Sequence, residues 1–199
     1  GRGYGDYSDG AYAGYRPAPH PEDGDDLSSK ITLTFRQAVK GATVSLKAAG
    51  KKFKTKVPAG VKNGQKIKIA GKGKPGKPGD MYLTVTVTED PKFTMDGKDL
   101  VMDLPITVGQ AVDGAKISAR DFDGNDVTFK VEKGTSSGEE VRVRGKGVET
   151  RTGTGDLVGR IQIRVPKHPT MGEKHAAKEF DKACGDFVEE LATENTETK

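Results

Sequence analysis

A glycine-rich run at residues 71–76 is the first candidate for a chemical role, because of the spacing of its glycines. It reads Gly71-Lys72-Gly73-Lys74-Pro75-Gly76 and matches the dinucleotide-binding fingerprint G-x-G-x-x-G. That fingerprint works where a helix begins at the glycines, because the helix N-terminus then holds the pyrophosphate. Here Lys77-Pro78-Gly79 and an alternating strand pattern follow instead. We therefore interpret the run as a flexible Gly/Lys loop between two strands.

Three aspartates form a second candidate, for calcium. Asp121, Asp123 and Asp126 resemble part of a calcium-binding loop, and Glu132 lies at loop position 12 counted from Asp121. However, Asp121-Phe122-Asp123-Gly124 is also a strong turn signal, and residues 127–131 favour a strand. A β-hairpin fits these residues better than a calcium loop.

The remaining reactive side chains form no catalytic group. His20, His168 and His175 lie far apart, and Cys184 occupies the apolar side of a helical pattern, where we expect a small core residue. An enzyme is therefore not expected, and neither is a metal or other cofactor. No apolar run approaches about 18 residues, so we expect no membrane span and a cytoplasmic location.

Charge is distributed very unevenly along the chain. Residues 31–79 contain twelve Lys and Arg36 but no Asp or Glu, whereas the whole chain has a net charge of +4. This basic segment predicts an anionic partner, with Lys47, Lys52 and Lys54 as candidate contacts. The alternative is that these lysines only keep exposed strand surfaces soluble.

The elements that must position these residues occur twice. Gln37 to Gly41 returns 73 positions later as Gln110 to Gly114, and further landmarks return at offsets of 74 to 76: Gly60, Gly64, Gly71-Lys72-Gly73 and Gly79-Asp80. A period this long indicates two tandem copies of one small domain rather than a solenoid. In both copies, alternating apolar and polar residues predict strands with one buried and one wet face.

The two ends of the chain differ from these copies. Residues 1–26 are rich in Gly, Tyr, Asp and Pro, which predicts a linker. Residues 173–191 have apolar side chains at helical spacing, which predicts one amphipathic helix of about five turns. An isolated helix of this kind must bury Phe180, Phe187 and Leu191, either against a second copy of the chain or against the second domain.

The first copy could bind an extended peptide at a sheet edge. We expect Ile31 and Leu33 to pair across a hairpin with Leu46 and Ala48, with Leu83 on a neighbouring strand completing an apolar floor. The alternative is that all five are ordinary core residues on the inward face.

Several motifs together resemble the C-terminal substrate-binding region of the DnaJ co-chaperones. They are Ile31 to Gly41, Val57 to Gly64, Gly71 to Gly73, Gly79-Asp80 and Asp96 to Leu100, with their counterparts in the second copy. The J-domain motif His-Pro-Asp and the four Cys-x-x-Cys pairs of the zinc-bearing subclass do not occur in these residues. The chain is thus similar to the zinc-free subclass.

The resemblance implies a mainly β fold of two tandem β-sandwich-like domains followed by a dimerisation helix. We expect a linker at 1–27, a client-binding domain at 28–92, a second domain at 93–168, and the helix and tail at 169–199. It also implies a homodimer that holds unfolded polypeptides and delivers them to a DnaK-type heat-shock ATPase. Ile31, Leu33, Leu46, Ala48 and Leu83 match the client groove, and the lysines match the surface that docks the acidic tail of that ATPase. The alternative partner of the basic segment is DNA, bound through phosphates and therefore sensitive to salt.

Overall fold

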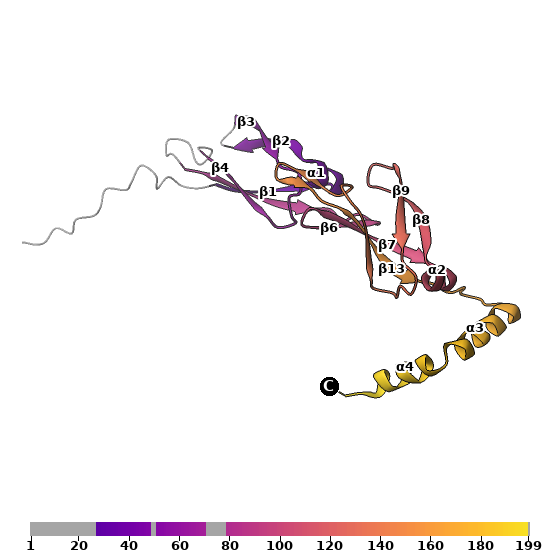
Figure 1. Cartoon of the computed structure of the whole chain (residues 1–199). Helices are drawn as coiled ribbons and strands as arrows, with labels where there is room; N and C mark the ends of the chain where they lie inside the picture. The colour runs from indigo at the N-terminus through magenta and orange to yellow at the C-terminus, as the bar shows by residue number, and fades with distance from the viewer. Residues whose placement is uncertain (1–26, 49–50, 71–78, 199) are drawn as a thin grey trace, which may run out of the picture. The chain divides into compact units, whose positions relative to one another are not determined.

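The computed structural model describes residues 27–48, 51–70 and 79–198. The predicted linker at 1–26 and the Gly/Lys loop at 71–76 lie outside the described residues. Within the described part, the chain is mainly β and ends in a pair of helices (Figure 1). The predicted fold class is therefore confirmed.

The first repeat forms two sheets. It comprises β1 (Leu27–Leu33), α1 (Phe35–Lys40), β2 (Ala42–Ala48), β3 (Lys51–Val57), β4 (Lys66–Ile69) and β5 (Met81–Val87). One sheet has the order β1-β5-β4, and β2 pairs with β3 in a separate ribbon. β1 runs parallel to β5, with Leu27 opposite Met81 and Leu33 opposite Val87. A parallel pair needs a long crossover, and the segment from α1 to β4 supplies it.

The expected hairpin between β1 and β2 is wrong. The helix α1 separates the two strands, and a reciprocal capping box fixes its start: the Thr34 hydroxyl accepts from the Gln37 N–H at 3.1 Å, and the Gln37 side chain accepts from the Thr34 N–H at 2.9 Å. Gly41 then ends the helix with φ 80° and ψ 157°, a conformation that is essentially restricted to glycine. The chain therefore leaves the first sheet at Leu33 and enters the ribbon at Ala42.

The second repeat reproduces this frame. It comprises β7 (Asp99–Ile106), α2 (Val108–Asp113), β8 (Ala115–Arg120), β9 (Asp126–Val131), β10 (Glu140–Val143) and β13 (Leu157–Ile163). A short strand, β6 (Phe93–Asp96), precedes it, and the β11 (Glu149–Thr150) and β12 (Gly153–Thr154) pair lies within it. The order β10-β13-β7-β6 repeats the order β4-β5-β1 of the first repeat and adds β6, while β8 pairs with β9 as β2 does with β3.

Backbone hydrogen bonds confirm the repeat in detail. The Gly64 N–H donates to the Val85 carbonyl at 2.7 Å, and the Gly138 N–H donates to the Ile161 carbonyl at 2.9 Å. The helix α2 has the same capping box, between Thr107 and Gln110, as α1. The duplicated residues of the sequence are thus those that set turns and caps.

Two apolar clusters of the described residues lie in the core of the first repeat. One contains the buried residues Leu33, Ala38, Val57, Val61 and Val85. The other contains Leu46, Met81 and Leu83, which brings the β2–β3 ribbon against the β1-β5-β4 sheet. Packing of a ribbon on a sheet fits the expected sandwich-like arrangement, and each fully buried side chain of this kind contributes about 1.5–3 kcal/mol.

The C-terminal segment forms two helices rather than the one predicted. They are α3 (Met171–Cys184) and α4 (Asp186–Thr196), and Gly185 lies between them with φ 58° and ψ −125°. Glycine adopts this conformation at no steric cost, so the helical hydrogen-bond pattern can stop there although the apolar spacing continues. Neither helix has a buried residue.

The chain divides into two compact units. The first contains residues 1–102, 119–127 and 142–159, and the second contains residues 103–118, 128–141 and 160–199. Each division point falls within a strand of the second repeat, so the units differ in composition from the sequence repeats. The domain boundaries expected from the sequence stay a prediction.

Candidate peptide-binding site

The residues expected to form the apolar floor have unequal exposure. Leu33, Leu46 and Leu83 are buried, whereas Ile31 is half-buried. Leu33 belongs to one core cluster and Leu46 and Leu83 to the other, while Ile31 packs against both. The backbone of Ala48 pairs with Lys51, but the side chain of Ala48 lies outside the described residues. Of the four side chains that can be placed, Ile31 is the one that keeps accessible apolar surface.

Val44 is the residue that sequence reasoning missed. It lies on β2 two positions before Leu46, is half-buried, and packs against both core clusters as Ile31 does. Its alternation with Ser45 was visible in the sequence and places it on the same face as Leu46. Ile31 on β1 and Val44 on β2 thus keep accessible apolar surface beside both core clusters, as does Ile67 on β4.

Both of these strands lie at sheet edges. Within the described residues, β1 pairs with β5 alone and β2 pairs with β3 alone. An edge strand presents unpaired backbone N–H and C=O groups that can accept another chain as an added strand. A strand edge beside half-buried apolar side chains can pair with the backbone of an extended peptide and contact its apolar side chains.

The outward side of the β2–β3 ribbon is basic. Lys47 lies directly opposite Lys52, and Ser45 lies opposite Lys54. The three lysines are exposed, and within the described residues none of them has an ion-pair partner. Like charges opposite one another in a ribbon repel. We call these residues (Lys47, Lys52 and Lys54) the lysine face, and an anion bound there would relieve that repulsion.

A second cationic group of the first repeat already has an anionic partner within the chain. Arg36 and Lys40 on α1 form ion pairs with Asp123 at 3.3 and 2.8 Å. The hydrogen bond from Lys40 is the main reason that the pKa of Asp123 lies below its ordinary value, and the charges of Lys40 and Arg36 lower it further. The side chain of Asp123 therefore serves to hold the turn against α1.

The predicted hairpin turn at residues 121–124 is confirmed. The carboxylate of Asp121 accepts from the N–H groups of Asp123 and Asn125 at 3.0 and 2.8 Å, and Gly124 has φ 83°. These bonds use Asp121 to shape the turn between β8 and β9. No group of three or more His, Cys, Asp or Glu side chains with metal-binding geometry occurs in the part of the chain that the structure describes.

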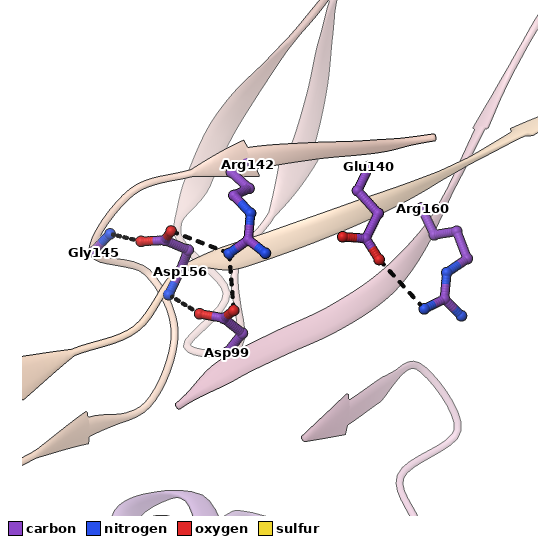
Figure 2. Close-up of polar contacts among 6 residues, drawn as sticks. All are labelled: Asp99, Glu140, Arg142, Gly145, Asp156 and Arg160. Atoms are coloured by element: carbon purple, nitrogen blue, oxygen red, sulfur yellow. Dashed lines mark hydrogen bonds and ion pairs between the residues drawn. The ribbon is translucent and has the colours of Figure 1, made fainter. Parts of the chain in front are cut away.

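Several charged side chains of the second repeat pair with one another, and Figure 2 shows two of these groups. The guanidinium of Arg142 on β10 lies 2.8 Å from a carboxylate oxygen of Asp99 and 3.3 Å from one of Asp156. On the same strand, Glu140 pairs with Arg160 of β13 at 3.6 Å. Asp156 also accepts from the Gly145 N–H at 3.1 Å, which fixes the start of the Gly145-Lys146-Gly147 turn.

These contacts shift two pKa values. The pKa of Asp99 is lowered, first by the hydrogen bond from the Asp156 backbone N–H at 2.8 Å and then by Arg142. The pKa of Arg142 is raised, mainly by its hydrogen bond to Asp99. Both shifts favour the charged forms, as expected for groups that stabilise a fold.

The C-terminal helices expose the apolar side chains that were expected to form an interface. Phe180 lies on α3, and Phe187, Val188 and Leu191 lie on α4; all four are exposed. Cys184, at the end of α3, is half-buried rather than a core residue. Among the described helices, none combines the length and the apolar character that a membrane crossing requires.

Comparison with known proteins gives one family for this arrangement. The family model described as the DnaJ C terminal domain matches residues 27–166. A DnaJ-like protein of Synechocystis sp. is 34% identical over 174 residues, which is 85% of this chain and 50% of that protein. Chaperone protein DnaJ 2 of Corynebacterium efficiens is 41% identical over 61% of this chain and 31% of its own length. Chaperone protein DnaJ of Clostridioides difficile is 36% identical over 70% of this chain and 38% of its own length. The chain thus spans half or less of the length of these curated relatives.

Proposed function

We propose, because this chain belongs to the DnaJ C-terminal domain family, that it is the client-binding part of a co-chaperone. In this proposal its first repeat binds exposed apolar segments of unfolded polypeptides and passes them to a DnaK-type heat-shock ATPase. The observation that carries the proposal is the pair of half-buried side chains, Ile31 and Val44, on two strands that are sheet edges among the described residues.

A client segment would bind as an added strand. Its backbone would pair with the edge of β1 or β2, which requires no particular sequence, and its apolar side chains would rest on Ile31 and Val44. Leu46 and Leu83 would support these two from beneath, because both belong to the cluster against which they pack. Leu33 and Ala48 are included in the site through the family resemblance.

The lysine face would bind the acidic C-terminal tail of the ATPase. Its three exposed cations have no ion-pair partner among the described residues, and they lie on the same ribbon as Val44. The DNA-binding alternative has no support beyond the charge of residues 31–79, and the three relatives above are DnaJ or DnaJ-like proteins.

Two copies of the chain would pair through the C-terminal helices. Exposed Phe180, Phe187 and Leu191 give these helices an apolar surface that burial in a homodimer would remove from water. Two client sites in one dimer would hold a polypeptide at two points and raise its apparent affinity.

The client site is tested by making its surface polar without changing the strands. The double variant Ile31→Thr, Val44→Thr keeps β-branched side chains, and we expect it to suppress the aggregation of a chemically unfolded model protein at least about fivefold less well. Val165→Thr is the control, because Val165 is an exposed valine of the second repeat. Suppression should persist at moderate salt. Undiminished suppression by a folded double variant would refute the assignment.

The homodimer is tested by sedimentation. Phe187→Asp places a charge in the proposed interface, and we expect it to shift the protein from dimer to monomer. Thr193→Asp adds the same charge to an exposed polar position of α4 and should leave the dimer intact. An unchanged sedimentation coefficient for Phe187→Asp would exclude α4 as the interface.

A further inference from the structure

The two short helices of the repeats bury the same inner side but differ on their outer side. Ala38 of α1 and Ala111 of α2, which are equivalent, are 0% and 4% exposed. On the outer side, Phe35 and Val39 of α1 are 8% and 2% exposed, whereas the equivalent Val108 and Val112 of α2 are 38% and 47% exposed. One outer face is thus covered and the other is open.

The covering of α1 comes from the hairpin turn at residues 121–124. The ring of Phe122 makes edge contacts with Phe35 and Phe93, with ring centroids 5.6 and 5.4 Å apart. Arg36 and Lys40 stack on the same ring at 5.3 and 5.9 Å from its centroid. Asp123, the next residue of the turn, forms ion pairs with Arg36 and Lys40 at 3.3 and 2.8 Å. The turn thus places an aromatic ring and then a carboxylate against two cations of α1.

A cleft beside each helix differs in the same way. Beside α1, a cleft of about 940 Å³ is lined by residues 40–43 and 56–59, and residues 149–152 form a further wall. Beside α2, the equivalent residues 113–116 and 130–133 line a cleft of about 330 Å³, and no third segment is among its lining residues. In the described part of the second repeat, nothing takes the place of the added wall.

We propose that the outer face of α2 (Val108, Val112 and Asp113) is a docking surface for another protein, which inserts an aromatic-tipped loop carrying a Lys or Arg. The aromatic tip follows from the way this fold covers the equivalent face of α1. The positive charge follows from the exchange of Lys40 for Asp113, because the partner charge must reverse with it. Gly109 stands in place of Arg36, so α2 offers an anion and no cation.

The charge match is local to this helix. Asp113 is exposed and, within the described residues, has no ion-pair partner. Lys130 and Glu132, which line the neighbouring cleft, pair with each other at 3.8 Å. Lys116 and Lys133 also line that cleft, so the prediction depends on the carboxylate of Asp113, which directly follows Val112 in the helix.

The chain's own hairpin provides a probe. A peptide with the sequence of residues 116–130 and the change Asp123→Lys, closed by a disulfide between cysteines added at its two ends, would be titrated into the ¹⁵N-labelled full chain. We expect amide shifts in residues 108–113 and binding at least about fivefold tighter than that of the same peptide with Asp123 retained. In the chain variant Asp113→Lys the preference should reverse, so that the unchanged peptide binds tighter.

Two further changes decide whether the site is the apolar face. Phe122→Ala in the peptide and Val112→Thr in the chain should each weaken binding at least about threefold, whereas Val165→Thr should not. Shifts confined to β1 and β2 would overturn the proposal, since they report the client site. Absence of shifts in α2 at millimolar peptide, or equal binding of both peptide charges, would overturn it too. Suppression of client aggregation should be unaffected by Asp113→Lys, which separates this proposal from the client site.

Discussion

The two repeats share one backbone frame and one ion pair, and they differ in the charges that their ribbons expose. The pair Lys68–Asp80 in the first repeat, at 3.2 Å, corresponds to Arg142–Asp156 in the second, at 3.3 Å. In the second repeat the carboxylate of Asp99 also lies 2.8 Å from Arg142. Asp26, which occupies the corresponding sequence position in the first repeat, lies outside the described residues.

The ribbons of the two repeats show this difference. On β8 and β9, Arg120 and Lys130 pair with Asp126 and Glu132, both at 3.8 Å. On β2 and β3 the lysine face has no ion pair among the described residues. Since the caps and turns fix the frame in both copies, the exposed charges can differ without changing it. The opposed lysines of β2 and β3 therefore suit an anionic partner better than the paired Arg120 and Lys130 of the second ribbon do.

The shared frame is tested most strongly at the two cap glycines. Gly41 and Gly114 have φ of 80° and 81°, and a Cβ on either would lie 3.1 or 3.0 Å from backbone atoms of the opposite strand. We expect Gly41→Ala and Gly114→Ala each to lower the free energy of unfolding by about 3 kcal/mol, from strain and overpacking together. Urea denaturation measures the loss, and hydrogen exchange shows which copy opens. If the smaller loss of free energy were less than about half of the larger one, the two caps would not be equivalent.

Turns and caps are the part of the fold that sequence predicts best. The turn at Asp121 was predicted because it is local: its hydrogen bonds join residues at most four positions apart. The capping boxes at Thr34 and Thr107 are equally local, although they were first seen in the structure. The parallel pairing of β1 with β5 was not predicted, since alternation fixes which face of a strand is buried but not which strand lies beside it. The break at Gly185 was missed because the apolar spacing continues through it.

The candidate site was predictable in part for the same reason. Alternation predicted that Ile31, Leu33 and Leu46 lie on the inward faces of their strands. The residues of a binding floor and those of a buried core alternate with the same period of two, so the pattern does not distinguish them. The difference between them depends on how much of each side chain the opposite sheet covers, which is a tertiary property. The contact of Phe122 with α1 was likewise invisible, because it joins residues 87 positions apart.

The charge contrast is tested by titrating an acidic peptide. Replacing Lys47, Lys52 and Lys54 with Gln should weaken binding of a peptide rich in Glu and Asp by about tenfold, or ~1.4 kcal/mol. The matched control removes three cations from the second repeat by changing Lys116, Arg120 and Lys130 to Gln, and it should change binding much less. Fluorescence anisotropy at two salt concentrations measures both. Equal losses would mean that net charge, and not the lysine face, attracts the peptide.

A smaller effect separates the Arg142 cluster from an isolated exposed ion pair. Arg142→Met leaves two carboxylates side by side, and we expect it to lower the thermal midpoint by about two to four degrees, because such exposed pairs contribute little. Lys130→Met is the control within the same repeat: Lys130 pairs with Glu132 at 3.8 Å, and the change should lower the midpoint less. A larger loss for Lys130→Met would contradict the view that the Arg142 cluster contributes more than an isolated pair.

The pH dependence of Asp99 sharpens the same comparison. Its pKa lies below the ordinary 3.8, so ionised Asp99 stabilises the fold above that pH, and this contribution is lost as the pH falls through the lowered pKa. The first cause of the shift is the Asp156 backbone N–H, which Arg142→Met leaves in place. We therefore expect the pKa of Asp99 in that variant to rise but to stay below 3.8, as followed by its carboxyl ¹³C shift, and the acid-induced loss of stability to become smaller. Lys68→Met should leave the titration of Asp99 unchanged. A value at or above 3.8 in Arg142→Met would make the guanidinium, rather than the backbone of the turn, the group that keeps Asp99 charged.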